Sequence, residues 1–216
     1  MKCFVGPSLY LVTHRKSLQL EDFFRVIRAS VDGGVKIVQL REKEVSAREI
    51  TTIGKKLLSI LKPLGIPLIV NDRVDVAHAI GADGVHLGQS DLRVTEARAI
   101  LGKNAMIGLS VESLEQAKAA REEDVDYLAA SPIFHTKTKT DCAEPWGLNG
   151  LKQLCAICNC PVIAIGGINV TNIKEIMECG AAGVAVVSAV FDAPCPKTVV
   201  CEMINRMKGY AISKMG

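Results

Sequence analysis

The chain has 216 residues, of which 49% are hydrophobic and 23% are charged, and its formal net charge is +3. This composition supports a buried core and excludes a highly charged, disordered chain. Basic runs with interleaved aromatic residues do not occur, so no nucleic-acid partner is expected. No apolar run approaches the roughly 20 residues that cross a bilayer, and the first residues lack the pattern of an export signal. We therefore expect one domain over 1–216 that resides in the cytoplasm, with no membrane partner.

Eight cysteines occur in the sequence, but disulfide frameworks belong to short secreted chains. Cys155, Cys158 and Cys160 form the tightest cluster. We interpret Cys155 and Cys158 as neighbours on one helix turn and Cys160 as the approach to the next strand. A metal or iron-sulfur site is the alternative, and it would require a fourth ligand. Reduced, buried thiols are expected.

Short β-branched runs alternate along the chain with longer segments of helical periodicity. This pattern is typical of repeated βαβ units and a parallel sheet. The predicted strands are Leu9 to Thr13, Ile37 to Arg41, Leu68 to Asn71, Gly84 to Leu87, Met106 to Ser110, Tyr127 to Ser131, Val162 to Gly166 and Val184 to Ser188. Eight right-handed units close most economically into a single-domain α/β fold, the (β/α)8 TIM barrel. An open, doubly wound sheet is the alternative.

Helical periodicity predicts helices between these strands, several of them closed by a glycine. The clearest helices are Leu18 to Ser30, Ala47 to Leu61, Leu114 to Glu122 and Ile173 to Cys179, and the closing glycines are Gly33, Gly65, Gly81 and Gly180. A Gly-Ala-x-Gly-Val motif occurs at 81–85 and again at 180–184, which indicates two helix-to-strand turns of similar construction.

Polar residues follow three neighbouring strands at the point where each strand ends. They lie in the segments 39–43, 71–73 and 86–91. Barrel active sites are built at the C-terminal ends of the strands, so these segments should share one rim. His86 and His135 should lie near this rim, but the four histidines show no common spacing, and we assign them no catalytic role.

Asp72 and Asp91 are two hard carboxylates on neighbouring strand ends, which favours a Mg²⁺ site that leaves positions open for phosphate oxygens. The alternative is that each Asp caps the following helix. Arg41 and Lys43 suit a diphosphate and would screen the negative charge on a departing phosphate, with Glu42 orienting one of them. A structural ion pair among these three residues is the alternative.

Two further segments indicate phosphate binding. The run from Ser131 to Thr140 supplies hydroxyls and two cations after an apolar Pro-Ile-Phe anchor, and we interpret it as a lid or clamp rather than a flexible loop. The segments 166–168 and 187–189 follow the last two strands, where barrels commonly bind phosphate at a helix N-terminus. A tight turn alone would also explain the Gly166-Gly167 pair.

Taken together, these segments resemble the thiamine phosphate synthase family over nearly the whole chain. The resemblance implies a transferase that joins a pyrimidine methyl diphosphate to a thiazole phosphate, giving thiamine phosphate and diphosphate, with Mg²⁺ on the leaving group. It implies a pyrimidine diphosphate site at Gln39, Leu40, Arg41, Glu42, Lys43, Asn71, Ser110 and Lys139, and Mg²⁺ on Asp72 and Asp91. It implies a thiazole phosphate site at Thr136, Lys137, Thr138, Gly167, Val187 and Ser188.

In the implied mechanism diphosphate leaves first and the thiazole nitrogen attacks a pyrimidine methyl cation, so charge stabilisation by Arg41, Lys43 and Lys139 replaces a general base. A related thiazole tautomerase is one rival, but it needs neither a diphosphate site nor a metal. A non-catalytic regulator that binds thiamine-related phosphates is another. More distant phosphate-binding barrels share only the last two strand loops. A homo-oligomer is compatible with the sequence.

Overall fold

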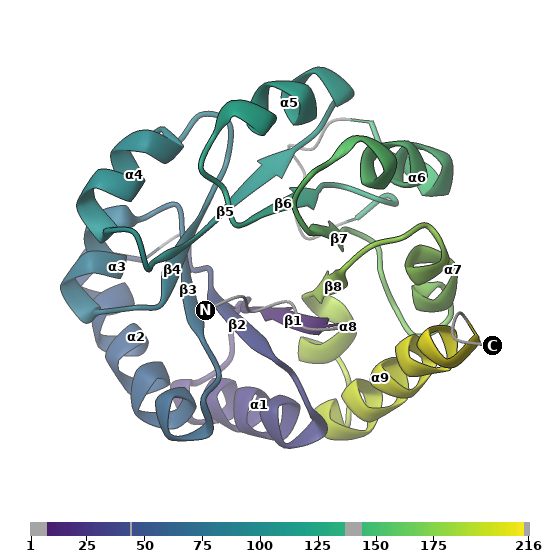
Figure 1. Cartoon of the computed structure of the whole chain (residues 1–216). Helices are drawn as coiled ribbons and strands as arrows, with labels where there is room; N and C mark the ends of the chain where they lie inside the picture. Colours follow the sequence, from purple (N-terminus) through teal and green to yellow (C-terminus); the bar gives the residue numbers. More distant parts are fainter. Residues whose placement is uncertain (1–7, 44, 137–143, 214–216) are drawn as a thin grey trace.

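The computed structural model is a closed barrel of eight parallel strands surrounded by helices (Figure 1). It describes residues 8–43, 45–136 and 144–213. The strands are β1 (Ser8–Val12), β2 (Ile37–Leu40), β3 (Leu68–Asn71), β4 (Gly84–Leu87), β5 (Met106–Val111), β6 (Tyr127–Ala130), β7 (Val162–Ile165) and β8 (Gly183–Val186). Each strand pairs with the next, and β8 pairs with β1, which closes the barrel. The TIM-barrel prediction is therefore confirmed.

A helix follows each strand and covers the outside of the barrel (Figure 1). The helices are α1 (Leu20–Gly33), α2 (Ala47–Leu61), α3 (Val74–Ile80), α4 (Val94–Leu101), α5 (Leu114–Ala119), α6 (Gly147–Ile157), α7 (Ile173–Glu178), α8 (Ser188–Phe191) and α9 (Pro196–Ser213). Two 3₁₀ turns, η1 (Lys62–Leu64) and η2 (Ala120–Glu122), extend α2 and α5. Within the described part of the chain, no helix has the length and apolar character needed to cross a membrane.

All eight predicted strands occur within two residues of their expected bounds. The first helix differs most, because it continues to Gly33 and its left-handed cap is Gly34, with φ of 111°. Gly33 has a different role. A Cβ at this position would lie 2.8 Å from Cγ1 of Val200, so the missing side chain lets α9 pack closely against α1.

Side chains alternate along each strand between the barrel interior and the helices, as the two-residue strand period requires. On β1, for example, Leu9 and Leu11 pack toward the helices, whereas Tyr10 and Val12 point inward. The inward residues that fill the lower interior are Tyr10, Ile37, Ile69, Met106, Tyr127, Ile163 and Ala185. The barrel is thus packed at this level, and a cavity opens above it toward the C-terminal strand ends.

The repeated Gly-Ala-x-Gly-Val motif has one physical explanation in both copies. Gly81 and Gly180 follow α3 and α7 with φ of 66° and 96°, a conformation that favours glycine. Gly84 and Gly183 open β4 and β8, where a Cβ would collide with the carbonyl oxygens of Met106 and Ser8 on the neighbouring strands. The motif therefore reverses the chain and then allows close strand pairing.

We expect Gly84→Ala to lower the free energy of unfolding by about 3 kcal/mol, because a backbone carbonyl cannot move aside without breaking the strand ladder. Gly65→Ala is the matched control, since Gly65 has a left-handed φ of 66° but open space around its Cβ position. Its cost should be only the backbone strain of about 1 kcal/mol. Urea unfolding measures both, and equal losses would contradict the role given to Gly84.

Candidate active site

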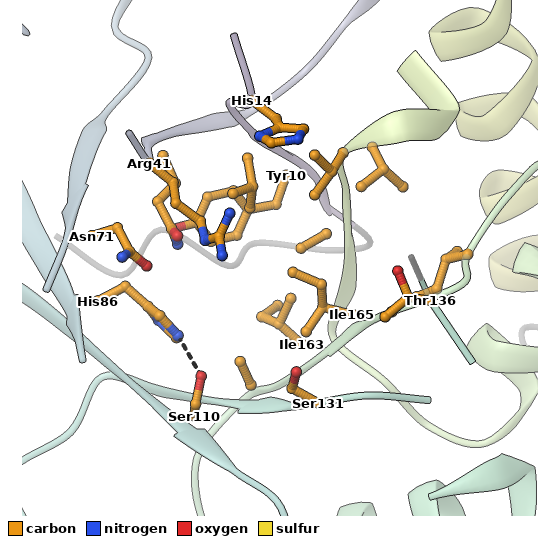
Figure 2. A pocket seen from close by; sticks show the side chains of 18 of the residues that line it. Tyr10, His14, Arg41, Asn71, His86, Ser110, Ser131, Thr136, Ile163 and Ile165 are labelled. Carbon is orange, nitrogen blue, oxygen red and sulfur yellow. Dashed lines mark hydrogen bonds between the residues drawn. The ribbon is translucent and has the colours of Figure 1, made fainter. Parts of the chain in front are cut away.

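A cavity of about 920 Å³ opens at the C-terminal ends of the strands (Figure 2). In this view Arg41, Asn71 and His86 lie on one side of the cavity and Thr136 lies on the other. The predicted site residues that line it are Gln39, Arg41, Lys43, Asn71, Asp72, Asp91, Ser110, Thr136, Gly167, Val187 and Ser188. The structure thus brings together residues from seven different strands or the loops that follow them.

Five predicted site residues are not placed in this cavity. Leu40 points to the opposite face of β2 and is buried against the helices, and Glu42 lies beside it in a smaller neighbouring pocket. Lys137, Thr138 and Lys139 lie outside the described residues. Strand alternation explains the position of Leu40, because Gln39 already points inward.

Thr13 joins the ends of β1 and β2 beside the predicted diphosphate site. Its hydroxyl accepts a hydrogen bond from the Arg41 N–H at 2.9 Å and donates one to Glu42 Oε1 at 3.1 Å. Burial raises the pKa of Glu42, while the hydrogen bond from Thr13 and the charges of Arg15 and Arg41 oppose that rise. Glu42 therefore helps to hold the backbone at the end of β2, from which the Arg41 side chain enters the cavity.

Asp72 and Asp91 form a pair of interacting carboxyl groups at the ends of β3 and β4. Burial raises the pKa of Asp72 to about 6, and both a hydrogen bond and the charge of Asp91 add to the rise. The positive charges of Lys43 and Arg41 act in the opposite direction. Asp72 also has a φ of 60°, a left-handed conformation that Asp and Asn tolerate better than most residues. The backbone thus holds the Asp72 carboxyl close to that of Asp91.

This pair has the chemistry of a Mg²⁺ site. Two carboxyl groups held close together are stabilised when a divalent cation lies between them. In the described parts of the chain, no group of three or more His, Cys, Asp or Glu side chains is placed to hold a metal. Two carboxylates fit Mg²⁺, which commonly takes its remaining ligands from water and phosphate oxygens.

The segment after β7 packs against the segment after β6. Ile133 and Phe134 donate backbone hydrogen bonds to the carbonyls of Ile165 and Gly166 at 2.9 and 3.1 Å. A Cβ on Gly167 would lie 2.7 Å from that of Phe134, and Gly167 has a φ of 66°. Close packing and backbone conformation thus both require the glycine. They also fix Thr136, which follows this anchor, on the same side of the cavity as Gly167.

The helix α8 begins at Ser188 on the same side of the cavity. N–H groups in the first turn of a helix have no intrahelical partner, which suits an anion. Lys16, in the loop after β1, forms an ion pair with Asp192 just beyond α8, with 2.8 Å between Nζ and Oδ1. Sequence reasoning missed this pair because nothing in the local pattern links residues so far apart in the chain.

Two tyrosines that sequence reasoning also missed lie at the floor of the cavity. The hydroxyls of Tyr10 and Tyr127 are 2.9 Å apart, and both residues line the cavity. Burial raises the pKa of both phenols well above the usual value, so both are neutral. Because both tyrosines lie on strands, their sequence positions indicate core packing. A buried tyrosine hydroxyl nevertheless normally requires a polar partner.

The cysteine cluster lies away from the cavity. Cys155 is on α6, but this helix ends at Ile157 and Cys158 follows in extended backbone, so the two do not share a helix turn as predicted. Burial raises the pKa of Cys155 to about 12 and that of Cys158 to about 11, which keeps both thiols protonated. They are packed thiols rather than reactive ones.

Comparison with known proteins identifies the family. Residues 9–190 match the family model described as thiamine monophosphate synthase. The chain belongs to this family. It is 50% identical to the thiamine-phosphate synthase of Albidiferax ferrireducens over 188 residues, which cover 87% of this chain and 86% of that one. It is 46% identical to the thiamine-phosphate synthase of Leptospira biflexa over 203 residues, or 92% and 97% of the two chains. The protein is therefore a transferase of thiamine biosynthesis.

Solved structures agree with the assignment to the thiamine monophosphate synthase family. A thiamine phosphate pyrophosphorylase from Pyrococcus furiosus superimposes with a TM-score of 0.85 at 36% identity, covering 94% of this chain and 96% of that one. A 3-hexulose-6-phosphate synthase from Salmonella typhimurium superimposes with a TM-score of 0.74 over 94% and 99% of the chains, but at 18% identity it shares the fold alone.

The raised pKa of Asp72 predicts a pH-dependent effect of Asp72→Asn. The folded protein binds the Asp72 proton more tightly than the unfolded chain, so the metal-free protein loses stability as the pH rises from about 4 to about 6. A neutral Asn avoids this loss and tolerates the left-handed backbone. In EDTA at pH 8 the variant should be more stable by up to about 1 kcal/mol after allowing for solvent screening, and at pH 4 the gain should vanish.

Asp75→Asn is the matched control for this measurement. Asp75 is exposed and paired with Arg73, and this partner lowers its pKa, so its replacement should not stabilise the protein at pH 8. Urea unfolding at the two pH values separates the cases. A gain for Asp72→Asn that is equal at pH 4 and pH 8 would contradict the ionisation argument.

Proposed function

We propose that this protein condenses 4-amino-2-methyl-5-(diphosphooxymethyl)pyrimidine with 4-methyl-5-(2-phosphoethyl)thiazole to give thiamine phosphate and diphosphate. The observation that carries this proposal is one cavity with a cationic, carboxylate-bearing side and a separate hydroxyl- and glycine-rich side. The first suits a diphosphate and the second suits a phosphate monoester. Family membership supports the same pair of reactants.

The pyrimidine diphosphate is proposed to lie along the ends of β2 to β5. Arg41 offers a planar fork and Lys43 a point charge to the diphosphate oxygens. Asn71 and Ser110 offer polar groups from the neighbouring strands, and all four residues line the cavity. Lys139 is proposed to add a further cation from the loop after β6, beyond the described residues, and Leu40 and Glu42 are proposed to contribute through the backbone and by fixing the end of β2.

Asp72 and Asp91 are the proposed Mg²⁺ ligands. A bound Mg²⁺ would supply positive charge to the departing diphosphate. Arg41 and Lys43 both lower the pKa of Asp72, so the two cations lie close enough to the carboxyl pair to interact with it, and all four residues line the cavity. This charge distribution favours diphosphate over a neutral leaving group.

The thiazole phosphate is proposed to lie across the cavity against Thr136, Gly167, Val187 and Ser188. This proposal is supported because all four residues line the cavity and α8 begins at Ser188. Lys137 and Thr138 are proposed to complete this subsite from the loop that Ile133 and Phe134 anchor. The thiazole ring nitrogen would then face the pyrimidine methylene carbon between the two walls.

The proposed reaction is a dissociative substitution. The bond between the methylene carbon and the diphosphate oxygen breaks, and its electron pair stays on the diphosphate. The resulting pyrimidine methyl cation accepts the lone pair of the thiazole nitrogen, which forms the new C–N bond. No proton has to be removed from either reactant, so the residues act by positioning and by neutralising charge rather than as general bases.

The direct test follows diphosphate and thiamine phosphate in parallel after both substrates are added to purified protein, with and without Mg²⁺. Mg²⁺-dependent formation of both products is expected. Isomerisation of a thiazole phosphate without use of the pyrimidine would favour the tautomerase, and tight binding without turnover would favour a regulator. The proposed location is the cytoplasm, because two phosphorylated substrates do not cross membranes unaided.

Substitutions on the two sides of the cavity should change different kinetic constants. Lys43→Met should lower kcat by about 10²-fold or more, because Lys43 is proposed to neutralise charge that develops as diphosphate leaves. Thr136→Val should mainly raise the KM for thiazole phosphate, by about tenfold, because it removes one hydrogen bond to that substrate. Steady-state kinetics with each substrate varied in turn distinguishes them. Equal effects on both KM values would contradict the division of the cavity into two subsites.

A further inference from the structure

Five polar side chains form a continuous hydrogen-bonded chain across the floor of the cavity. Gln39 Nε2 donates to the Tyr10 hydroxyl at 2.9 Å, and that hydroxyl lies 2.9 Å from the Tyr127 hydroxyl. Tyr127 lies 3.0 Å from His86 Nδ1, and His86 Nε2 lies 2.9 Å from Ser110 Oγ (Figure 2). The residues come from β2, β1, β6, β4 and β5 in turn, and all of them except Ser110 are buried.

The barrel is shaped to hold this chain. The His86 and Tyr127 rings stack with centroids 5.5 Å apart, and Tyr10 meets Tyr127 edge to face at 6.0 Å. Gly108 on β5 makes room for both, because a Cβ there would collide with the Tyr127 ring and lie 2.5 Å from His86 Nδ1. Gln89 Nε2 donates to the Ser110 carbonyl at 2.6 Å, which holds the backbone at Ser110 in place. The side chains therefore have little freedom to exchange partners.

The Gln39 amide sets a direction at the start of this chain. An amide Nε2 can only donate, so the Tyr10 oxygen accepts from Gln39, and its single proton is left for Tyr127. The Tyr127 hydroxyl is then able to donate its own proton to His86 Nδ1. In that arrangement a neutral imidazole carries its proton on Nε2 and donates to Ser110 Oγ. Both phenols stay neutral in their buried positions, so neither can break this order.

The two ends of the chain reach the cavity with opposite hydrogen-bonding character. Gln39 uses its amide nitrogen on Tyr10, which leaves its carbonyl oxygen as an acceptor. Ser110 accepts from His86, which leaves its hydroxyl proton for donation. Both residues line the cavity. The floor thus offers an acceptor at one end of the chain and a donor at the other to a ring that rests on it.

We infer that Tyr10, Tyr127 and His86 are positioning residues that fix this acceptor and donor to select an amino-substituted pyrimidine over its oxo analogue. The inference rests on the proposed function. A 4-aminopyrimidine carries an amino donor and ring-nitrogen acceptors, which match the Gln39 acceptor and the Ser110 donor. The 4-oxo analogue carries a carbonyl next to a ring N–H, so both contacts would become mismatched.

The first test measures the tautomer of His86 and needs no substrate. In ¹⁵N NMR spectra of the full-length protein, the His86 signals are assigned as those lost in His86→Gln. We expect an imidazole with a proton on Nε2 and none on Nδ1. The opposite tautomer in the wild-type protein would overturn the inference, whatever the activity proves to be.

The second test compares Tyr127→Phe with the wild-type protein. The KM for the aminopyrimidine diphosphate should rise at least tenfold while that for thiazole phosphate stays within twofold, and the preference for the 4-amino over the 4-oxo substrate should fall at least tenfold. Ser30→Ala is the matched control, because it removes a buried hydroxyl that bonds the Val26 carbonyl on α1, far from the cavity. Its kinetics should be unchanged.

The outcomes separate this inference from the proposed function. Equal rises in both KM values, or an unchanged amino preference in Tyr127→Phe, would overturn the positioning role even if the wild-type protein forms thiamine phosphate. If the wild-type protein forms no thiamine phosphate, the binding of the 4-amino and 4-oxo pyrimidines can still be compared. A preference for the amino compound that is lost in Tyr127→Phe would support the inference. Equal binding of the two compounds to the wild-type protein would refute it.

Discussion

The pairing of β1 with β8 joins the two ends of the chain and determines where every functional residue lies. Once these strands pair in parallel, all eight strands point the same way, and their C-terminal ends form one rim. Gly183 makes the closure fit, because the Ser8 carbonyl occupies the space of a Cβ. Polar segments that are distant in the sequence thereby meet around one cavity, with Arg41 and Ser188 on its wall.

The closed barrel also fits the proposal that one cavity holds two anions. The ends of β2 to β4 carry cations around a carboxyl pair, whereas the segments after β6 to β8 offer hydroxyls, glycines and a helix start. Below both, neutral buried groups such as Tyr10 and Tyr127 exclude water without adding charge. Charge is therefore concentrated at the rim, where a diphosphate would leave, and the floor is left to recognise an uncharged ring.

The sequence predicted the strands because β-branched runs and closing glycines are local signals. It also predicted the rim residues Arg41, Asp72 and Asp91, since strand position alone assigns them to one edge. It did not predict the hydrogen-bonded side chains on the cavity floor. From the sequence alone Tyr127 and His86 look like ordinary inward-facing core residues, because their partners lie on other strands. The error at Gly33 had the same origin, since only the packing of α9 against α1 explains that glycine.

The most direct test of the account is anomalous scattering from crystals grown with Mn²⁺ in place of Mg²⁺ and with the pyrimidine diphosphate bound. The account predicts one metal peak between the Asp72 and Asp91 carboxyls, the diphosphate beside Arg41 and Lys43, and the pyrimidine ring on the floor near Gln39 and Ser110. A metal peak elsewhere, or a diphosphate against Gly167 and Ser188 instead, would contradict the division of the cavity on which the proposed chemistry depends.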